Sequence, residues 1–98
     1  MWILETDESV PDRTTFRIPS GSVKTIGRST GAEFKLDAPL VSRLHCQLSA
    51  TDKALQVKDL DSTNGTFVNG RRINFAKLQP GDRLTVGRVE LRISRTDS

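Results

Sequence analysis

The sequence predicts an all-β sandwich, and three observations support this fold class. Short stretches of alternating apolar and polar residues recur along the 98 residues, and the clearest of them runs from Val89 to Ser94. Turn-forming residues separate these stretches every few positions, and no segment shows a sustained helical period. About ten short strands joined by frequent turns are typical of two packed β-sheets.

Each predicted strand is a short apolar or alternating stretch that ends at turn-forming residues. The predicted strands cover residues 2–5, 14–18, 23–26, 34–36, 46–50, 54–60, 66–68, 71–73, 84–86 and 89–94. Residues 6–13 are polar and contain Pro11, so we expect a loop there. Residues 95–98 are expected to form a polar tail.

Four dipeptides carry strong turn signals. Asn69-Gly70 and Gly87-Arg88 are predicted as two-residue hairpin loops, the first of type I′, because Asn and Gly both tolerate positive φ. Asn64-Gly65 is expected to form a type I′ turn for the same reason. Pro80-Gly81 fits the two central positions of a type II turn.

The composition indicates one small folded domain with a polar surface. The apolar fraction is 35%, and 15 Lys and Arg against 12 Asp and Glu give a net charge of +3. A mild basic excess suits an anionic partner, but an ordinary solvated surface explains it equally well.

The sequence excludes several other classes of site. One cysteine, Cys46, allows no intrachain disulfide, and together with the single His45 it cannot form a zinc site. We expect no cofactor and no metal. The apolar start, residues 1–4, meets Glu5 too early for a signal peptide, and no apolar run is long enough for a membrane span. We therefore expect a soluble, intracellular protein without a membrane partner.

Four motifs occur in a specific order. They are Gly27-Arg28, residues 42–45 (Ser-Arg-Leu-His), residues 62–66 (Ser-Thr-Asn-Gly-Thr) and Asn69-Gly70. Their order and spacing closely resemble the forkhead-associated (FHA) domain, a phosphothreonine-binding module, and the resemblance extends from about residue 23 to residue 93. It implies a β-sandwich of about eleven short strands with the binding loops at one end. Residues 1–98 are then a single FHA domain with its core at about 2–94, and we expect it to be part of a longer protein.

The resemblance assigns Arg28, Ser42 and Arg43 to the phosphopeptide. A guanidinium offers a planar set of donors that fits phosphate oxygens, although an exposed arginine in a surface salt bridge is the plain alternative. Ser42 can donate its hydroxyl to a phosphate oxygen, whereas loop serines otherwise serve as turn or cap residues. Arg43 matches a family position that contacts the peptide, and a solvated arginine at the rim is its alternative.

The motif at residues 62–66 supplies the other binding residues. Thr63 and Asn64 match the loop that faces the bound threonine and the residue after it, and an Asn amide can both donate to and accept from a peptide backbone. Gly65 shapes the turn. Gly27 and His45 are expected to support the site, His45 through ring hydrogen bonds that fix the loop presenting Ser42.

Three further residues are candidates for peptide specificity. The family often selects the third residue after the phosphothreonine, and the position that commonly contacts it is Leu40 here. Some members have arginine at this position and select an acidic residue, so Leu40 suggests an apolar contact instead. Lys24 and Lys35 can still favour acidic flanks.

The first residues suggest a subfamily. Met1-Trp2 directly before the domain resembles the nibrin-like proteins of DNA double-strand-break repair, which begin with an FHA domain and continue into paired BRCT domains. This resemblance implies a nuclear role in DNA damage signalling, against other FHA adaptors in phospho-signalling.

Two functions of other classes compete with peptide binding. A hydrolase would use Ser42, His45 and an acid such as Asp37, but no Gly-x-Ser-x-Gly elbow surrounds Ser42. A nucleic-acid binder is disfavoured because the basic residues are scattered and no basic and aromatic residues alternate. We therefore predict a non-catalytic module that binds a phosphothreonine protein or peptide, with no direct nucleic-acid partner.

Overall fold

The computed structural model describes residues 1–6 and 13–96, and these residues form eleven strands and no helix. The all-β prediction is therefore confirmed. The expected loop at residues 6–13 lies largely outside the described residues. The strands are β1 (Trp2–Thr6), β2 (Thr15–Ile18), β3 (Val23–Gly27), β4 (Phe34–Lys35), β5 (Cys46–Ala50), β6 (Leu55–Asp59), β7 (Thr66–Val68), β8 (Arg71–Ile73), β9 (Phe75–Leu78), β10 (Arg83–Val86) and β11 (Val89–Arg95).

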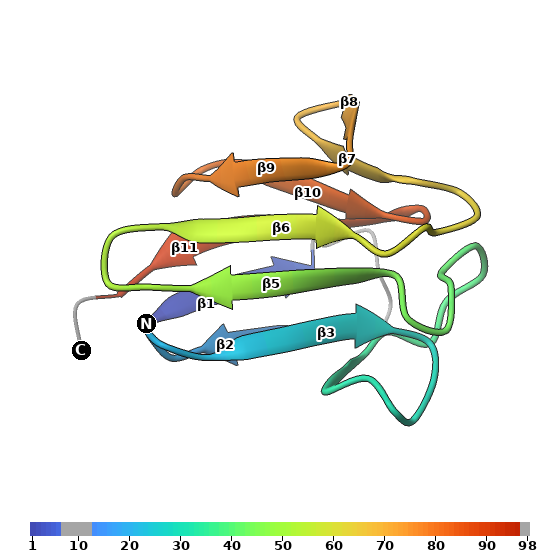
Figure 1. Cartoon of the computed structure of the whole chain (residues 1–98), viewed down its shortest axis with the longest axis horizontal. Helices are drawn as coiled ribbons and strands as arrows, with labels where there is room; N and C mark the ends of the chain where they lie inside the picture. The colour runs from blue at the N-terminus through green and yellow to red at the C-terminus, as the bar shows by residue number, and fades with distance from the viewer. Residues whose placement is uncertain (7–12, 97–98) are drawn as a thin grey trace.

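The strands form two sheets that pack face to face (Figure 1). One sheet has six strands in the order β2-β1-β11-β10-β7-β8, and the other has five in the order β4-β3-β5-β6-β9. Neighbouring strands in both sheets are antiparallel except β3 and β4, which are parallel. The chain passes from one sheet to the other between β6 and β7, so the motif at residues 62–66 bridges the two sheets.

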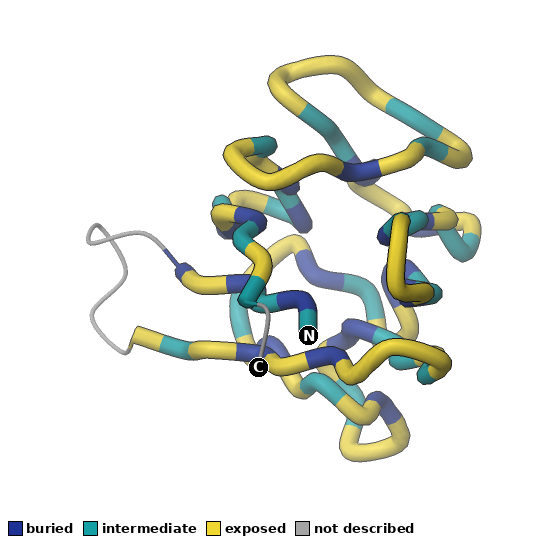
Figure 2. The backbone as a smooth tube through the Cα atoms, turned by 90° about the vertical axis from the view of Figure 1, so that its left-hand side faces the viewer, coloured by how far each residue is buried: buried dark blue, intermediate teal, exposed yellow. Residues whose placement is uncertain are grey.

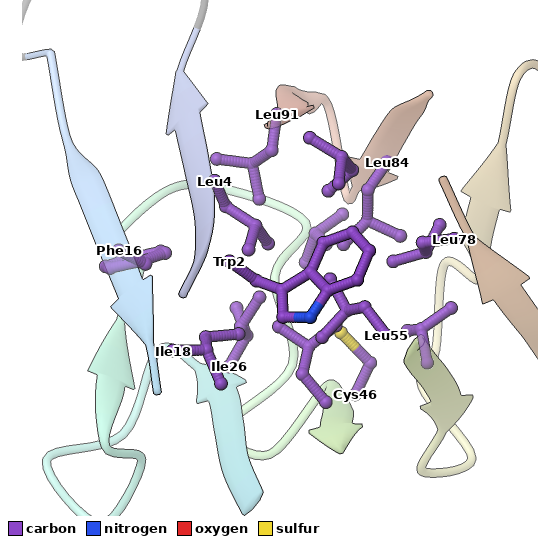
Figure 3. Close-up of a cluster of buried hydrophobic side chains, with 14 of the residues drawn as sticks. Trp2, Leu4, Phe16, Ile18, Ile26, Cys46, Leu55, Leu78, Leu84 and Leu91 are labelled. Atoms are coloured by element: carbon purple, nitrogen blue, oxygen red, sulfur yellow. The ribbon is translucent and has the colours of Figure 1, made fainter. Parts of the chain in front are cut away.

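The core lies between the sheets and follows from the alternation of each strand. Leu91 and Ile93 of β11 are fully buried, whereas the intervening Arg92 is exposed. Figure 2 shows this change between buried and exposed positions along the backbone. Trp2 lies at the centre of the buried side chains in Figure 3, and its indole Nε1 donates to the carbonyl oxygen of Thr51 at 3.0 Å.

Two strand predictions differ from the structure. Residues 75–78 form β9, which the sequence analysis missed because this edge strand pairs only with β6 and buries only Leu78 well. Arg95 belongs to β11 rather than to a polar tail, because it pairs with Trp2 of β1. Residues 97 and 98 lie outside the described part of the chain.

The turn predictions are confirmed at three places and wrong at one. Asn69 and Gly70 both have positive φ, 51° and 83°, as a type I′ turn requires, and Gly81 has the positive φ of a type II turn. Gly87 has positive φ in the hairpin between β10 and β11. At residues 64–65 only Gly65 has positive φ, so no type I′ turn forms. The reason is topological: this segment joins two different sheets and is not a hairpin.

Three of the four motifs, at residues 27–28, 42–45 and 62–66, lie in loops at one end of the sandwich. Strands β3 and β6 end there, and β5 and β7 begin there (right-hand side of Figure 1). The β10–β11 hairpin reaches the same end, because Gly87 lies against the backbone of Leu40. The N-terminus and the turn between β5 and β6 lie at the opposite end (Figure 1). The fourth motif, Asn69-Gly70, lies away from the end that carries the other three, because it follows the end of β7 and Asn69 is hydrogen-bonded to Asp82 and Arg83 at the start of β10.

Candidate functional site

Gly27 allows two loops to meet at the end of β3. A Cβ atom added to Gly27 would lie 1.9 Å from the carbonyl oxygen of Arg43, so only glycine fits at this position. The backbone N–H of Arg28 donates to the Ser42 carbonyl at 3.0 Å, and the N–H of Ser29 donates to the Arg43 carbonyl at 3.1 Å. This close approach places the Arg28 and Ser42 positions side by side.

The side chain of Arg28 is exposed to solvent. It makes no hydrogen bond or ion pair with any residue that the structure describes. A guanidinium held by its backbone at a loop end, with its donors unused, is available to an anion from solution.

Ser42 connects this pair of loops to the third. The backbone N–H of Thr63 donates to Oγ of Ser42 at 3.1 Å. Because the hydroxyl oxygen accepts this bond, the hydroxyl hydrogen remains free to donate to a ligand. Ser42 therefore fixes the position of residue 63 and can still serve an anion beside Arg28.

His45 connects the same loops from the interior of the domain. It is fully buried, its Nδ1 accepts from the backbone N–H of Ser42 at 3.0 Å, and its Nε2 lies 2.8 Å from the Gly65 carbonyl oxygen. An Nδ1 that accepts a hydrogen bond carries no proton, so the proton is on Nε2 and is donated to Gly65. One ring thus ties the Ser42 loop to the 62–66 loop.

Asp59 organises the 62–66 loop from the end of β6. Its Oδ1 accepts from Oγ of Ser62 and from Oγ1 of Thr66, both at 2.6 Å, and its Oδ2 accepts from the Ser62 N–H at 3.1 Å. Oγ of Ser62 in turn accepts from the Gly65 N–H at 3.0 Å. Desolvation by burial would raise the pKa of Asp59, but the hydrogen bonds from Ser62 and Thr66 outweigh it and hold the pKa below its usual value.

Leu40 and Asn64 meet at the edge of the site. The side-chain Nδ2 of Asn64 donates to the Leu40 carbonyl at 3.0 Å. Leu40 has a φ of 72°, which is unusual for a residue with a branched side chain, and the residue is 42% exposed. The backbone here is packed against Gly87, where an added Cβ would lie 2.9 Å from the Leu40 carbonyl. These contacts present the Leu40 side chain to solvent beside Asn64.

The remaining predicted residues do not all lie near the site. Arg43 and Thr63 are exposed and belong to the joined loops. Lys35 is also exposed and pairs with Gly27 in the β3–β4 register. Lys24 lies three residues back along β3, about 10 Å from the loop end at strand rise, so the structure does not bring it to the site.

Sequence reasoning missed Asp59 and Arg72, and it assigned no role to Ser62 within the 62–66 motif. The Asp-x-x-Ser spacing of Asp59 and Ser62 is typical of a side chain that accepts from a nearby backbone N–H, and it could have indicated their contact. No local signal marks Arg72, because it reaches the loop from β8: an added Cβ at Gly65 would lie 2.9 Å from its Nε.

The geometry argues against the hydrolase alternative. Both ring nitrogens of the buried His45 contact backbone groups, those of Ser42 and Gly65, and neither contacts the Ser42 hydroxyl. Asp37 is exposed and does not orient the ring. The arrangement lacks the contact from base to nucleophile that a serine hydrolase requires.

Cys46 is a buried core residue, as expected. Burial and, to a smaller extent, the charge of Asp59 raise the pKa of its thiol, a hydrogen bond with Thr66 partly opposes them, and the net result is a pKa of about 12. In the parts of the chain that the structure describes, no group of three His, Cys, Asp or Glu side chains could hold a metal ion. The same residues contain no helix long and apolar enough to cross a membrane.

Three known proteins are similar to this chain, the first in sequence and the other two in structure. The ABC transporter ATP-binding/permease protein Rv1747 of Mycobacterium tuberculosis is 40% identical over 81 residues, which cover 83% of this chain and 9% of that protein. The crystal structure of the FhaA FHA domain in complex with the intracellular domain of Rv3910 has a TM-score of 0.84 and 30% identity, over 95% of this chain and 99% of that one. A structure from a study of phosphothreonine-dependent FHA domain interactions has a TM-score of 0.84 and 29% identity, over 99% and 98% of the two chains.

These relatives do not support the nibrin-like subfamily or a nuclear location. The first curated relatives are proteins of mycobacteria and corynebacteria, and this chain spans between 9% and 47% of their lengths. The family model described as the FHA domain matches residues 24–87, which is more than half of the chain. The chain belongs to the FHA domain family.

Proposed function

We propose that this domain binds phosphothreonine peptides at the joined loops and so recruits phosphorylated partner proteins, without catalysis. The observation that carries the proposal is the position of Arg28. Its guanidinium is exposed and without a partner among the described residues, and its backbone is hydrogen-bonded to Ser42, whose hydroxyl hydrogen is free. Arg28 would supply the charge, and Ser42 a neutral donor, to the same phosphate.

Thr63 and Asn64 would contact the peptide next to the phosphate. The N–H of Thr63 is already held by Ser42, which fixes the start of this loop before a ligand arrives. Asn64 uses one amide hydrogen on the Leu40 carbonyl, so its Oδ1 remains an acceptor for a peptide N–H. Arg43, Leu40 and Lys35 are candidates for contacts with flanking residues, and Lys24 is too far along β3 to be one of the first contacts.

The pathway in which this domain acts is a separate proposal. Phosphorylation-dependent signalling fits the relatives best, since one of the similar structures comes from work on phosphothreonine-dependent interactions. A role in DNA double-strand-break repair, with BRCT domains elsewhere in a longer chain, stays a prediction that none of the relatives favours.

Three peptides of one sequence test the function: one with phosphothreonine, one with phosphoserine and one unphosphorylated. We expect measurable binding of the phosphothreonine peptide, weaker binding of the phosphoserine peptide and none of the third. The threonine methyl group accounts for the difference, about 0.8 kcal/mol from burial alone and roughly 1–3 kcal/mol in a tight pocket.

Repeating these titrations at high salt separates charge from shape. Both phosphopeptides should weaken through screening, whereas their affinity ratio should persist because both carry the same phosphate. Equal affinities would show a generic anion site, and equal binding of the unphosphorylated peptide would refute the proposal.

A further inference from the structure

A second arginine, besides Arg28, lies against the 62–66 loop. Arg72 belongs to β8, and a Cβ atom added at Gly65 would lie 2.9 Å from its Nε and 3.2 Å from its Cζ. The guanidinium therefore lies directly against the backbone of Gly65. Gly65 has no side chain to prevent this approach, and its positive φ of 91° disfavours any other residue.

Strand pairing fixes the direction from which Arg72 approaches. Arg72 is opposite Phe67 in the antiparallel β7–β8 pair, so both side chains project from the same face. The Cε1 atom of Phe67 also lies 3.3 Å from the same Cβ position at Gly65. The Arg72 guanidinium and the Phe67 ring thus both lie beside Gly65 on the same face of the β7–β8 pair.

No group in the described structure uses this charge. Arg72 is exposed and makes no hydrogen bond or ion pair with a described residue. Its neighbour Arg71 is also exposed, but it pairs with Val68 and, by strand alternation, projects from the opposite face. Only one of the two adjacent arginines is therefore directed at the loop.

We propose that Arg72 is a specificity-determining residue that binds an anionic side chain of the peptide close to the phosphothreonine. The inference rests on the proposed function, because residues 63 and 64 of the same loop would contact the peptide. Two positions of an extended peptide span about 7 Å, and Thr63 and Gly65, two residues apart in the loop, lie within about that distance of each other. The partner of Arg72 is a carboxylate or a second phosphate, since a guanidinium binds either through paired oxygens.

The experiment is a scan of acidic residues around a fixed phosphothreonine. Peptides with neutral flanks are compared with peptides that carry one aspartate at each of the three positions before and after the phosphothreonine. Each is titrated against the wild-type domain, Arg72→Gln and Arg71→Gln, with thermal unfolding to verify that the variants are folded. At the position where aspartate raises the affinity most, a peptide with phosphoserine in place of that aspartate shows whether Arg72 prefers a second phosphate to a carboxylate.

We expect the wild type to prefer aspartate at one position or more by about three- to tenfold. Arg72→Gln should lose this preference and keep its affinity for the neutral phosphothreonine peptide, whereas Arg71→Gln should retain the preference. An equal loss in both variants would assign the effect to net charge and overturn the inference. So would a wild type without any acidic preference, and in that case binding of the neutral peptide would leave the proposed function intact. Absence of all phosphopeptide binding would overturn both.

Discussion

Oδ1 of Asp59 lies 2.6 Å from Oγ1 of Thr66, and this hydrogen bond joins the two sheets at the end that carries the loops. Asp59 ends β6 of one sheet, and Thr66 begins β7 of the other. The same carboxylate accepts two hydrogen bonds from Ser62, so one side chain fixes both ends of the loop that begins at residue 60. The shape of this loop therefore depends on an ionised group outside the motif itself.

Asp59→Asn should destabilise the domain in a pH-dependent way. At neutral pH we expect a loss of about 1–3 kcal/mol in the free energy of unfolding, because the carboxylate accepts three hydrogen bonds that an amide cannot all replace. The pKa of Asp59 is lowered in the folded state, so its contribution is complete above about pH 5 and is lost as the pH falls through the folded value. Denaturant unfolding of both proteins between about pH 3 and pH 7, a range that includes the ordinary carboxyl pKa of about 4, tests this expectation.

The control for Asp59 is Asp37→Asn. Asp37 is an exposed carboxylate in a loop, and no hydrogen bond of its side chain is seen among the described residues. This variant should differ little from the wild type. A difference between Asp59→Asn and the wild type that stayed constant down to the lowest pH would contradict the role of the ionised carboxylate.

Gly27→Ala should damage both stability and binding. The added Cβ would lie 1.9 Å from the Arg43 carbonyl oxygen, and this is a backbone atom that cannot move without breaking the hydrogen bonds between the two loops. We expect a loss of about 1–3 kcal/mol of stability, measured by denaturant unfolding, and weaker phosphopeptide binding. Gly31→Ala is the matched control, since its added Cβ meets nothing closer than 3.5 Å. Equal stability of the two variants would contradict this prediction, because it would show that the two loops can move apart without a loss in the free energy of unfolding.

Arg28→Gln should remove most of the phosphopeptide affinity and leave the fold intact. We expect a loss of about 2–5 kcal/mol in binding free energy, as for one partner of a desolvated charge pair. The thermal midpoint should hardly change, because the side chain is exposed and makes no hydrogen bond or ion pair with a described residue. Arg17→Gln removes an equal charge from an exposed position on β2 and should bind like the wild type. Unchanged affinity of Arg28→Gln would remove this arginine from the site.

His45→Ala should lower the thermal midpoint as well as the affinity. The substitution leaves the Ser42 N–H and the Gly65 carbonyl without their partner and creates a cavity, so we expect a loss of about 2–4 kcal/mol of stability. Calorimetry and peptide titration of the same sample measure the two effects together. A variant as stable as the wild type that had lost only binding would instead indicate direct contact between His45 and the ligand.

Most of the fold could be predicted because its signals are local. Alternation along β11 and the Asn69-Gly70 turn need only a few neighbouring residues to be recognised. Strand β9 was missed because its burial depends on its single neighbour, β6, rather than on its own pattern. The type I′ prediction at residues 64–65 was wrong because the dipeptide alone does not show that the flanking strands belong to different sheets.

The candidate site was predictable in part for the same reason. The motifs around Arg28, Ser42 and Asn64 indicated which residues to examine, and the structure brings their backbones together. Lys24 was proposed from its charge alone, and its position on β3 places it away from the loops. Arg72 carried no signal, since its contact with Gly65 depends on the pairing of β7 with β8.

The sequence by itself determined the fold class, most strand positions and the four motifs of the family, because alternation, turn chemistry and motif spacing are properties of neighbouring residues. Only the tertiary structure decided how these motifs act on one another. The contacts that shape the site join residues from different strands or loops. They are the hydrogen bonds of the His45 ring, the three hydrogen bonds accepted by Asp59, and the close approach of Arg43 to Gly27. Such contacts depend on the packing of two sheets, and a hydrogen bond or a steric limit exists only where that packing brings its two partners within reach.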